Sequence, residues 1–285
     1  MEPKLIHRGK VRDVYDVGQG MLHLVSTDRL SAFDIVLADT IPHKGEVLND
    51  VSAYHLQMAG RAGIPTHYVD RTGSGTMLVY RLGMIPVEVI IRGYLYGSAW
   101  DRYRRGEFSL PSGTEPRKGA KFSEPMVEFT TKLEASDRPV TADEILHNDW
   151  MSANEIAYVV ATALRVHQIV EENAAKGGIL LADQKLEFGR NLMIDDVPIL
   201  GDEVGTPDSS RFWNAELYAD NYRAGNDQPS FDKQYVRDYL LSARGWDKKR
   251  PPAGTHLTEP LLTPEVVART AEKYLEARTR IITLA

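Results

Sequence analysis

Cysteine is absent from this chain of 285 residues. Its absence excludes disulfide frameworks, cysteine-ligated zinc, iron–sulfur clusters and thiol catalysis. The sequence also lacks an uninterrupted apolar run of about 18 residues, which a membrane-spanning helix needs, and it begins without an apolar segment of signal-peptide length. We therefore expect a soluble, cytoplasmic protein that does not associate with membranes.

An excess of positive charge is missing as well, because the formal net charge is -6. General nucleic-acid binding, which needs an electropositive face, is therefore not expected. Small anionic ligands remain possible, since a site needs only local positive charge. The hydrophobic fraction of 42% and the charged fraction of 26% are typical of a globular protein. The length predicts one large domain or two closely packed ones.

The first hundred residues favour short strands joined by tight turns. Val11, Asp13, Tyr15 and Val17 would share one face of a strand, and Met21–Val25 is the expected hairpin partner across two glycines. Further strands are expected over Ile35–Leu37, Met77–Tyr80 and Val87–Ile91. Asn49 is the expected N-cap of a helix that ends near Gly63. This pattern predicts a largely antiparallel sheet.

The remainder of the chain mixes helices and strands. A polar segment over residues 106–139 contains four prolines and is predicted to be irregular. Ser152 and Glu155 form a capping box that opens the clearest helix, in which His167 is expected to be a core residue. Asp195-Asp196 is the expected turn of a later hairpin.

Two groups of charged residues suggest a nucleotide site. Gly9-Lys10-Val11-Arg12 precedes a strand, where glycine lets backbone amides approach a phosphate and two cations add charge. Asp183, Lys185 and Glu187 alternate along a strand and so share one face, and Asp202 follows the next hairpin. Two carboxylates with open positions suit Mg²⁺ held together with substrate phosphates. The alternatives are a solvated basic edge strand and an exposed charged strand face.

Three further segments could bind anions. Ser210 and Arg211 of DSSR offer hydroxyl and guanidinium donors, although a helix N-cap is an alternative. Arg92 and Ser98 lie at a turn before a short helix, which is an alternative reason for that pattern. Lys132 lies in the irregular segment and could close over a phosphate, although most loop lysines are simply solvated. Together these features predict an enzyme that binds two phosphorylated ligands and performs ATP-dependent phosphoryl chemistry. One ligand could be Mg-ATP and the other a sugar phosphate.

Five strings of the sequence resemble those of the SAICAR synthetase family in order and spacing. They are HRGKVRDVYD, STDRLSAFD, PVEVIIRGYLYGSAW, ADQKLEFG and GDEVGTPDSSRFW. The resemblance covers about residues 4–239, and the combination of KLEFG, GDE and PDSSRFW is highly specific for this family.

The resemblance implies an α+β fold related to protein kinases and ATP-grasp enzymes. An N-terminal antiparallel β lobe (residues 1–92) would cover ATP, and a larger α+β lobe (residues 93–285) would carry the metal and ribonucleotide sites, with ATP in the cleft between them. The implied reaction joins 5-amino-1-(5-phosphoribosyl)imidazole-4-carboxylate to L-aspartate, using ATP and Mg²⁺, through an acyl phosphate. The alternatives are a small-molecule kinase on the same scaffold and a catalytically silent nucleotide-binding module.

The resemblance also implies roles for single residues. Lys10 and Arg12 would cover the ATP phosphates, Glu88 would lie at the adenine hinge, mostly through its backbone, and Lys132 would face the reacting phosphate. The metal ligands would be Glu187 and Asp202, which with Lys132 form the catalytic group. The residues implied to bind the ribonucleotide are Asp34, Arg92, Ser98, Ser210 and Arg211.

One departure from the family pattern lies after Lys132. Many members carry a His-Asp pair a few residues beyond this lysine, whereas this chain has Ser136 before Asp137. A role that depends on that histidine therefore cannot be transferred. The segment beyond Tyr239 lies outside the motifs and is expected to pack on the core or to build an interface.

Overall fold

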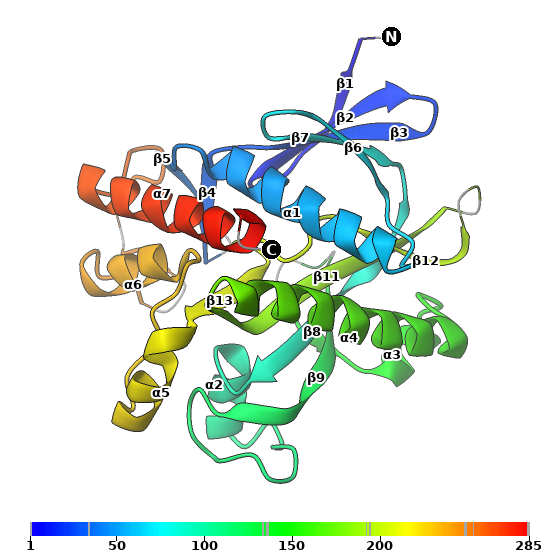
Figure 1. Cartoon of the computed structure of the whole chain (residues 1–285). Coiled ribbons are helices and arrows are strands. Elements are labelled where there is room, and N and C mark those ends of the chain that lie inside the picture. Colours follow the sequence, from blue (N-terminus) through cyan, green and yellow to red (C-terminus); the bar gives the residue numbers. More distant parts are fainter. Residues whose placement is uncertain are drawn as a thin grey trace.

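The computed structural model describes residues 2–33, 35–132, 134, 137–191, 193, 195–247, 250–252 and 254–283. Two antiparallel sheets organise the chain, with helices packed around them (Figure 1). The α+β class with antiparallel sheets is therefore confirmed. Among the described residues, no helix is both long and apolar enough to cross a membrane.

The N-terminal sheet has five strands, and all neighbouring pairs are antiparallel. Their spatial order is β1 (Lys4–Arg8), β2 (Arg12–Gly18), β3 (Met21–Ser26), β7 (Thr76–Tyr80) and β6 (Tyr68–Gly73). The predicted hairpin is confirmed, since β2 pairs with β3 from Arg12 opposite Ser26 to Gly18 opposite Met21. The apolar side chains of β3 and β7 face the core and pack beside α1 (Lys44–Arg61).

Helix α1 begins earlier than the sequence predicts. Its first residue is Lys44, so Asn49 lies inside the helix, is fully buried and does not cap it. The N-cap position is His43, whose φ of 66° is left-handed. The apolar stripe already begins with Val47 and Leu48, and burying these two side chains favours the extra turn.

The second sheet contains the strands that carry most of the predicted site residues. Its order is β10 (Pro139–Val140), β9 (Lys121–Thr131), β8 (Gly83–Tyr94), β11 (Ile179–Asn191) and β12 (Asp195–Gly201), and β13 (Ser210–Asn214) also pairs with β11. The predicted domain boundary at residue 92 falls inside β8, so β8 itself connects the two parts of the molecule. The division into residues 1–92 and 93–285 stays a prediction.

Two sequence expectations for this sheet are wrong. The segment 106–139 contains β9, a strand of 11 residues that pairs with β8. Pro125 is accommodated because the β8–β9 register shifts at this point, between Arg92 and Tyr94. The second error concerns the hairpin, because Asp195 already belongs to β12 and pairs with Asn191 instead of forming the turn.

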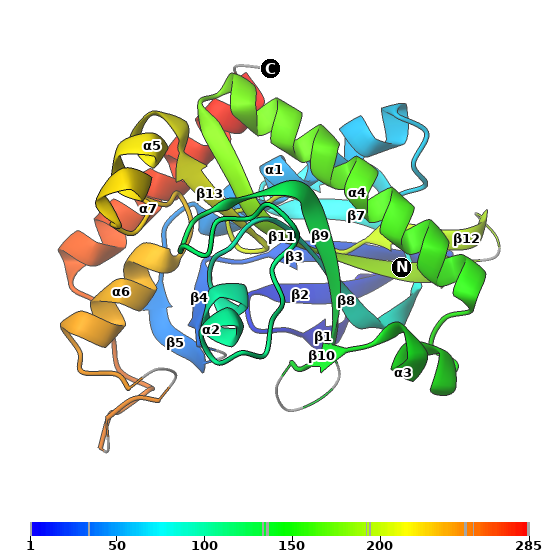
Figure 2. The ribbon, with the colours of Figure 1, turned by 90° about the horizontal axis from the view of Figure 1, so that it is seen from below.

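The longest helix, α4 (Ala153–Lys176), lies across the second sheet against β11 (Figure 2). The capping box of Ser152 and Glu155 is confirmed at its start. His167 is confirmed as a core residue with 1% exposure, and its Nδ1 accepts a hydrogen bond from Gln184. The shorter helices nearby are α2 (Ser98–Arg104), α3 (Ala142–His147) and α5 (Ala215–Ala224).

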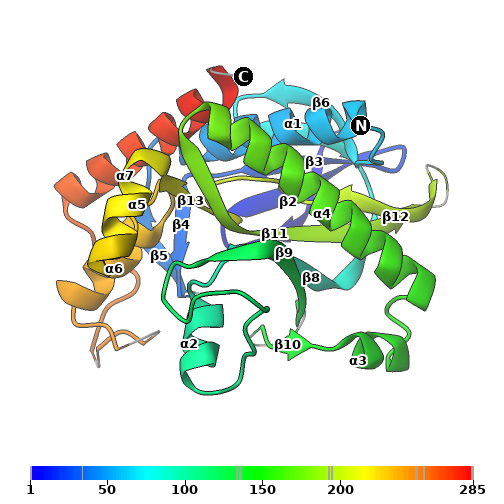
Figure 3. The ribbon, with the colours of Figure 1, turned by 60° about the horizontal axis from the view of Figure 1, so that its bottom comes forward.

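A second apolar cluster joins the N-terminal and C-terminal parts of the chain. It lies between the two-stranded sheet of β4 (Arg29–Ala32) and β5 (Ile35–Thr40) and the helices α6 (Gln234–Ser242) and α7 (Pro264–Arg278) (Figure 3). Helix α7 continues into a π-helical segment, Thr279–Thr283, and packs along α1. The C-terminal segment therefore packs on the core, as predicted.

Candidate functional site

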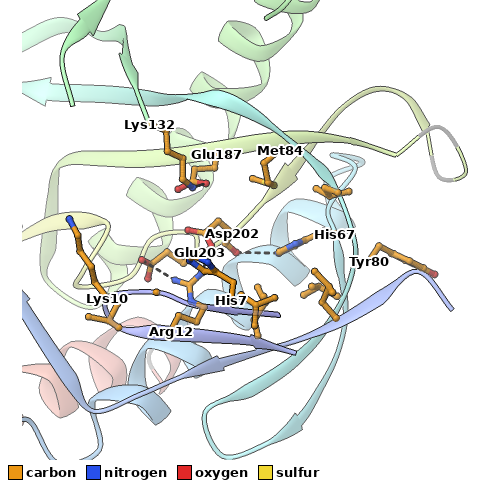
Figure 4. Close-up of a pocket in the computed structure, with 17 residues that line it drawn as sticks. His7, Lys10, Arg12, His67, Tyr80, Met84, Lys132, Glu187, Asp202 and Glu203 are labelled. Carbon is orange, nitrogen blue, oxygen red and sulfur yellow. Dashed lines mark hydrogen bonds and ion pairs between the residues drawn. The ribbon is translucent and has the colours of Figure 1, made fainter. Parts of the chain in front are cut away.

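A cavity of about 480 Å³ lies between the two sheets and has two chemically different parts (Figure 4). Its apolar part is lined by side chains of both sheets and of the segment that connects them, namely Val14, Leu22, Leu24, Val79, Leu82 and Met84. Its charged part is lined by Lys10, Arg12, Lys132, Glu187, Asp202 and Glu203. An apolar slot next to concentrated charge matches a ligand with a flat ring and a polyanionic group.

Strand geometry brings the two predicted metal ligands together. Glu187 of β11 lies opposite Gly201 of β12, and Asp202 follows directly after that strand. Asp202 has a left-handed φ of 54°, and the chain leaves the strand at this residue. Both side chains line the same cavity. The prediction that carboxylates from neighbouring strands converge is therefore met by the geometry.

Cations balance these carboxylates. Arg12 forms an ion pair with Asp202, and its second terminal nitrogen lies 3.1 Å from a Glu203 oxygen. Lys132 forms an ion pair with Glu187. Burial opposes ionisation of Asp202, but the charges of Arg12 and Lys132 outweigh this effect, so the pKa of Asp202 lies below its ordinary value. For Glu203 burial outweighs the attraction of Arg12, and its pKa is raised.

The donor set fits a magnesium ion. Glu187 and Asp202 supply hard oxygen ligands, and the other positions around an octahedral ion would be open to phosphate oxygens and water. Within the described ranges, no group of three or more histidine and acidic side chains forms a complete protein cage for a metal. Two carboxylates beside cationic side chains are typical of a metal that arrives with a phosphorylated ligand.

His67 is a member of this cavity that the sequence analysis missed. Its Nε2 donates a hydrogen bond of 3.2 Å to the backbone carbonyl of Asp202. Burial lowers the pKa of His67 to about 4, so the ring is neutral at pH 7. It therefore supports the backbone of a metal-ligand candidate without adding charge. No local motif marks it, because its partner lies 135 positions further along the chain.

A second cavity, of about 490 Å³, brings together the predicted residues of β8 and α2. Arg92 donates a hydrogen bond of 3.0 Å to Ser98, and its Nε lies 2.6 Å from a Glu128 oxygen. Arg211 lines the same cavity and pairs with Asp183 on β11. The guanidinium groups are therefore held in fixed orientations, as anion recognition requires.

A third cavity, of about 100 Å³, adjoins the second, because Lys185, Arg211 and Arg237 line both. Ser210 lines it too, and its buried hydroxyl has no hydrogen-bond partner among the described residues. The sequence analysis missed Lys233 and Arg237 of the α6 region. They carry no motif, and only the packing of α6 beside the segment before β13 brings them here.

The structure does not bring every predicted residue to these cavities. Glu88 is not among the residues that line them, and its carboxylate lies 2.5 Å from the ammonium group of Lys185. Leu82 and Met84, rather than Glu88, line the apolar part of the first cavity, where an adenine ring would lie. Asp34 and Ser136 lie outside the described residues.

Comparisons with known proteins show the family of this chain. The family model described as SAICAR synthetase matches residues 5–253. The phosphoribosylaminoimidazole-succinocarboxamide synthase of Halorhodospira halophila is 40% identical over 297 residues, with 98% of this chain and 94% of the relative covered. The enzyme of the same name from Desulfosudis oleivorans is 41% identical, with 96% and 93% covered.

Solved structures show the same fold. The SAICAR synthase of Saccharomyces cerevisiae complexed with SAICAR matches with a TM-score of 0.80 and 31% identity, over 99% of this chain and 95% of that one. A SAICAR synthetase in complex with ADP matches with a TM-score of 0.72 and 26% identity, over 99% and 98% of the two chains.

Proposed function

This chain belongs to the SAICAR synthetase family, and on this premise we propose that the cavity between the sheets binds ATP with Mg²⁺ and that the two adjoining cavities bind the imidazole ribonucleotide. The chain is an ATP-dependent ligase of purine biosynthesis that carries out the SAICAR synthase reaction. The observation that supports the placement of ATP is that Arg12, Lys132, Glu187 and Asp202 converge on a cavity that apolar side chains also line.

In this proposal each part of the first cavity has a separate task. The apolar side chains cover the adenine ring, and Leu82 and Met84, rather than the carboxylate of Glu88, lie at its edge. Lys10 and Arg12 approach the phosphates from the N-terminal sheet. Glu187 and Asp202 would hold Mg²⁺, which neutralises charge on the phosphate oxygens when bound.

The chemistry needs an activated carboxylate, because a free carboxylate is a poor electrophile. We propose that a carboxylate oxygen of the ribonucleotide attacks the γ-phosphorus of ATP, so that ADP leaves and an acyl phosphate forms. The amine of L-aspartate then attacks the carbonyl carbon, phosphate leaves, and the nitrogen loses a proton. Lys132 lines the cavity that we propose binds ATP, and it would orient the transferred phosphoryl group.

The adjoining cavities supply binding energy away from the reacting atoms. Arg92, Ser98, Ser210 and Arg211 line them, and we propose that they bind the phosphate of the ribonucleotide. Lys185 adds positive charge to the same region, as do Lys233 and Arg237, which no sequence motif marks. Anchoring a remote phosphate fixes the imidazole carboxylate relative to ATP. The predicted role of Asp34 in this region stays a prediction.

A phosphate-release assay tests this proposal and separates it from the kinase alternative. The purified protein receives Mg-ATP and the imidazole carboxylate ribonucleotide, first without and then with L-aspartate. We expect sustained release of ADP and phosphate only when all three substrates are present. A stable phosphorylated ribonucleotide without aspartate would instead show a kinase.

The metal assignment is tested by Asp202→Asn. Removal of groups that only support a metal ligand costs about 10–100-fold in metal affinity or activity, so loss of a ligand should lower kcat by about 100-fold or more at saturating Mg²⁺. Asp220→Asn is the matched control, because Asp220 is a surface residue of α5 with 78% of its side chain exposed. A near-normal kcat in the Asp202→Asn variant would show that the metal assignment is wrong.

A further inference from the structure

A buried ionic cluster lies next to the ribonucleotide cavities, outside the groups that the proposed reaction uses. At its centre is Asp208, whose side chain is 3% exposed. One carboxylate oxygen lies 2.7 Å from Nζ of Lys44, the first residue of α1, whose side chain is fully buried. The other oxygen accepts a hydrogen bond of 2.6 Å from the hydroxyl of Tyr274, a fully buried residue of α7.

Asp208 lies in the segment that connects the proposed metal ligand Asp202 to the proposed ribonucleotide ligands Ser210 and Arg211. The segment between β12 and β13 begins with Asp202 and Glu203 and leads into β13, whose first two residues are Ser210 and Arg211. Within it, the Thr206 hydroxyl donates to Glu203 at 2.6 Å, and the Thr206 carbonyl accepts a hydrogen bond of 2.8 Å from the amide of Ser210. Asp208 therefore attaches this segment to α1 and α7, in addition to the hydrogen bonds that Val204 makes with Ser52 and His55 of α1.

The two ends of the segment have different supports. The ATP end is held by the ion pair of Arg12 with Asp202 and by the hydrogen bond from His67. The ribonucleotide end is held through Asp208, which lines the third cavity together with Ser210 and Arg211. Lys233, 4.0 Å from Asp208, lines that cavity as well. Loss of a donor to Asp208 should therefore disturb the ribonucleotide end first.

Helix α7 supplies Tyr274 from outside the part of the chain that the family model matches, which ends at residue 253. Figure 1 shows α7 lying beside α1, so Lys44 and Tyr274 reach Asp208 from two packed helices. Two donors from different helices fix both oxygens of the carboxylate, and this leaves it a single orientation.

We propose that Tyr274 and Lys44 are positioning residues, which act through Asp208 to hold Ser210 and Arg211 in the geometry that binds the ribonucleotide. The inference rests on the proposed function, because it takes the second and third cavities to be the ribonucleotide site. It gives the C-terminal helix a role in substrate binding in addition to its role in the core.

The test is Tyr274→Phe, which removes one hydroxyl and keeps the ring. We expect the KM for the ribonucleotide to rise about three- to tenfold, which is less than for direct loss of a hydrogen bond to a charged group because Tyr274 acts through Asp208, while the KM for ATP changes less than about twofold. Tyr235→Phe, a substitution of the same kind at a partly buried residue of α6 beside Lys273, is the matched control and should change neither constant.

A double-mutant cycle shows whether the effect passes through Asp208. In an Asp208→Asn background, Tyr274→Phe should add almost nothing to the rise in KM. A full additional effect there, or an equal rise in both KM values together with a lower unfolding temperature, would show a merely structural role and overturn the inference. If Asp208→Asn does not fold, the difference between the two KM values in Tyr274→Phe decides.

Failure of the inference and failure of the proposed function give different results. If Arg211→Ala raises the KM for the ribonucleotide but Tyr274→Phe does not, the positioning role is wrong and the site assignment stands. If Arg211→Ala also leaves that KM unchanged, the ribonucleotide site has been assigned to the wrong cavities.

Discussion

Single residues of opposite charge face each other across the cavity between the sheets. Arg12 is shared between Asp202 and Glu203, and Lys132 pairs with Glu187 (Figure 4). Removing one member of an ion pair leaves the other charge uncompensated. This lowers the free energy of unfolding by about 3–5 kcal/mol for a fully buried pair, and by less for part-buried pairs such as these. Each of these side chains is therefore held in place by its partner, and the site is organised by its own charges.

At the residue scale, the clearest prediction concerns Arg211. Its guanidinium pairs with Asp183 and stacks over the ring of Tyr96, 5.0 Å from the ring centre. Arg211→Ala should raise the KM for the ribonucleotide by about tenfold or more, because a charged hydrogen bond contributes about 1.5–3 kcal/mol. The KM for ATP should change far less, as steady-state kinetics with each substrate varied in turn will show.

The control for this substitution is Arg223→Ala. Arg223 lies on α5 with 75% of its side chain exposed and pairs with Asp220. It should leave both KM values as they are. An Arg211→Ala variant whose KM for the ribonucleotide equals that of Arg223→Ala would remove Arg211 from the substrate site.

The sequence predicts two site residues as neighbours only where the regular spacing of a strand or hairpin connects them. Glu187 and Asp202 follow from alternation along one strand and from a hairpin to the next, and the structure brings them together. His67, Lys233 and Arg237 join the cavities only through tertiary packing, and no local spacing reveals such contacts. For Lys10, Arg92 and Ser98, the family motifs supplied roles that the residues alone left open.

At the scale of whole elements, local sequence signals predict turns and helix starts better than they predict the full length of a helix or strand. The β2–β3 hairpin and the start of α4 follow from turn and capping chemistry, which acts within a few residues. Strand β9 was missed because Pro125 and neighbouring polar residues suggest a loop, whereas pairing with β8 along the strand outweighs that local preference. Helix α1 likewise begins before Asn49 because core burial decides its first turn.

The start of α4 offers a prediction about stability. The Glu155 side chain accepts hydrogen bonds from Arg190 and from the backbone and hydroxyl of Ser152, and despite partial burial these contacts lower its pKa to about 2. Because the pKa of Glu155 in the folded protein lies below the ordinary glutamate pKa of 4.5, this stabilisation is fully present above pH 4.5 and is lost as the pH falls through about 2.

We therefore expect Glu155→Gln to lower the free energy of unfolding by about 0.5–1 kcal/mol at pH 7, and by almost nothing near pH 2. Urea unfolding of both proteins over this pH range measures the difference. Glu272→Gln is the control, because Glu272 pairs with Arg269 on the surface of α7 with 63% of its side chain exposed. A difference for Glu155→Gln that stays constant with pH would contradict the assigned ion pair.

At the scale of the whole molecule, two buried histidines join the layers of the fold. His55 of α1 donates from Nδ1 to the carbonyl of Val204 at 3.3 Å, and the close approach of Gly205 to the same ring leaves no room for a side chain there. His167 of α4 contacts Gln184 of β11. Burial lowers the pKa of each histidine to about 4.

These histidines predict how the molecule responds to mild acid. In the folded protein the pKa of each histidine is about 4, below the ordinary histidine pKa of 6.5. The unfolded chain therefore binds protons more readily, and the free energy of unfolding decreases as the pH falls below 6.5. Each histidine should reduce the free energy of unfolding by about 1.5 kcal/mol between pH 6.5 and pH 5. Urea unfolding at intervals of half a pH unit measures this slope, and His167→Gln should remove about a third of it, because burial lowers the pKa of His67 to about 4 as well. A free energy of unfolding that is constant from pH 6.5 to pH 5 would show that neither ring is held neutral by the core.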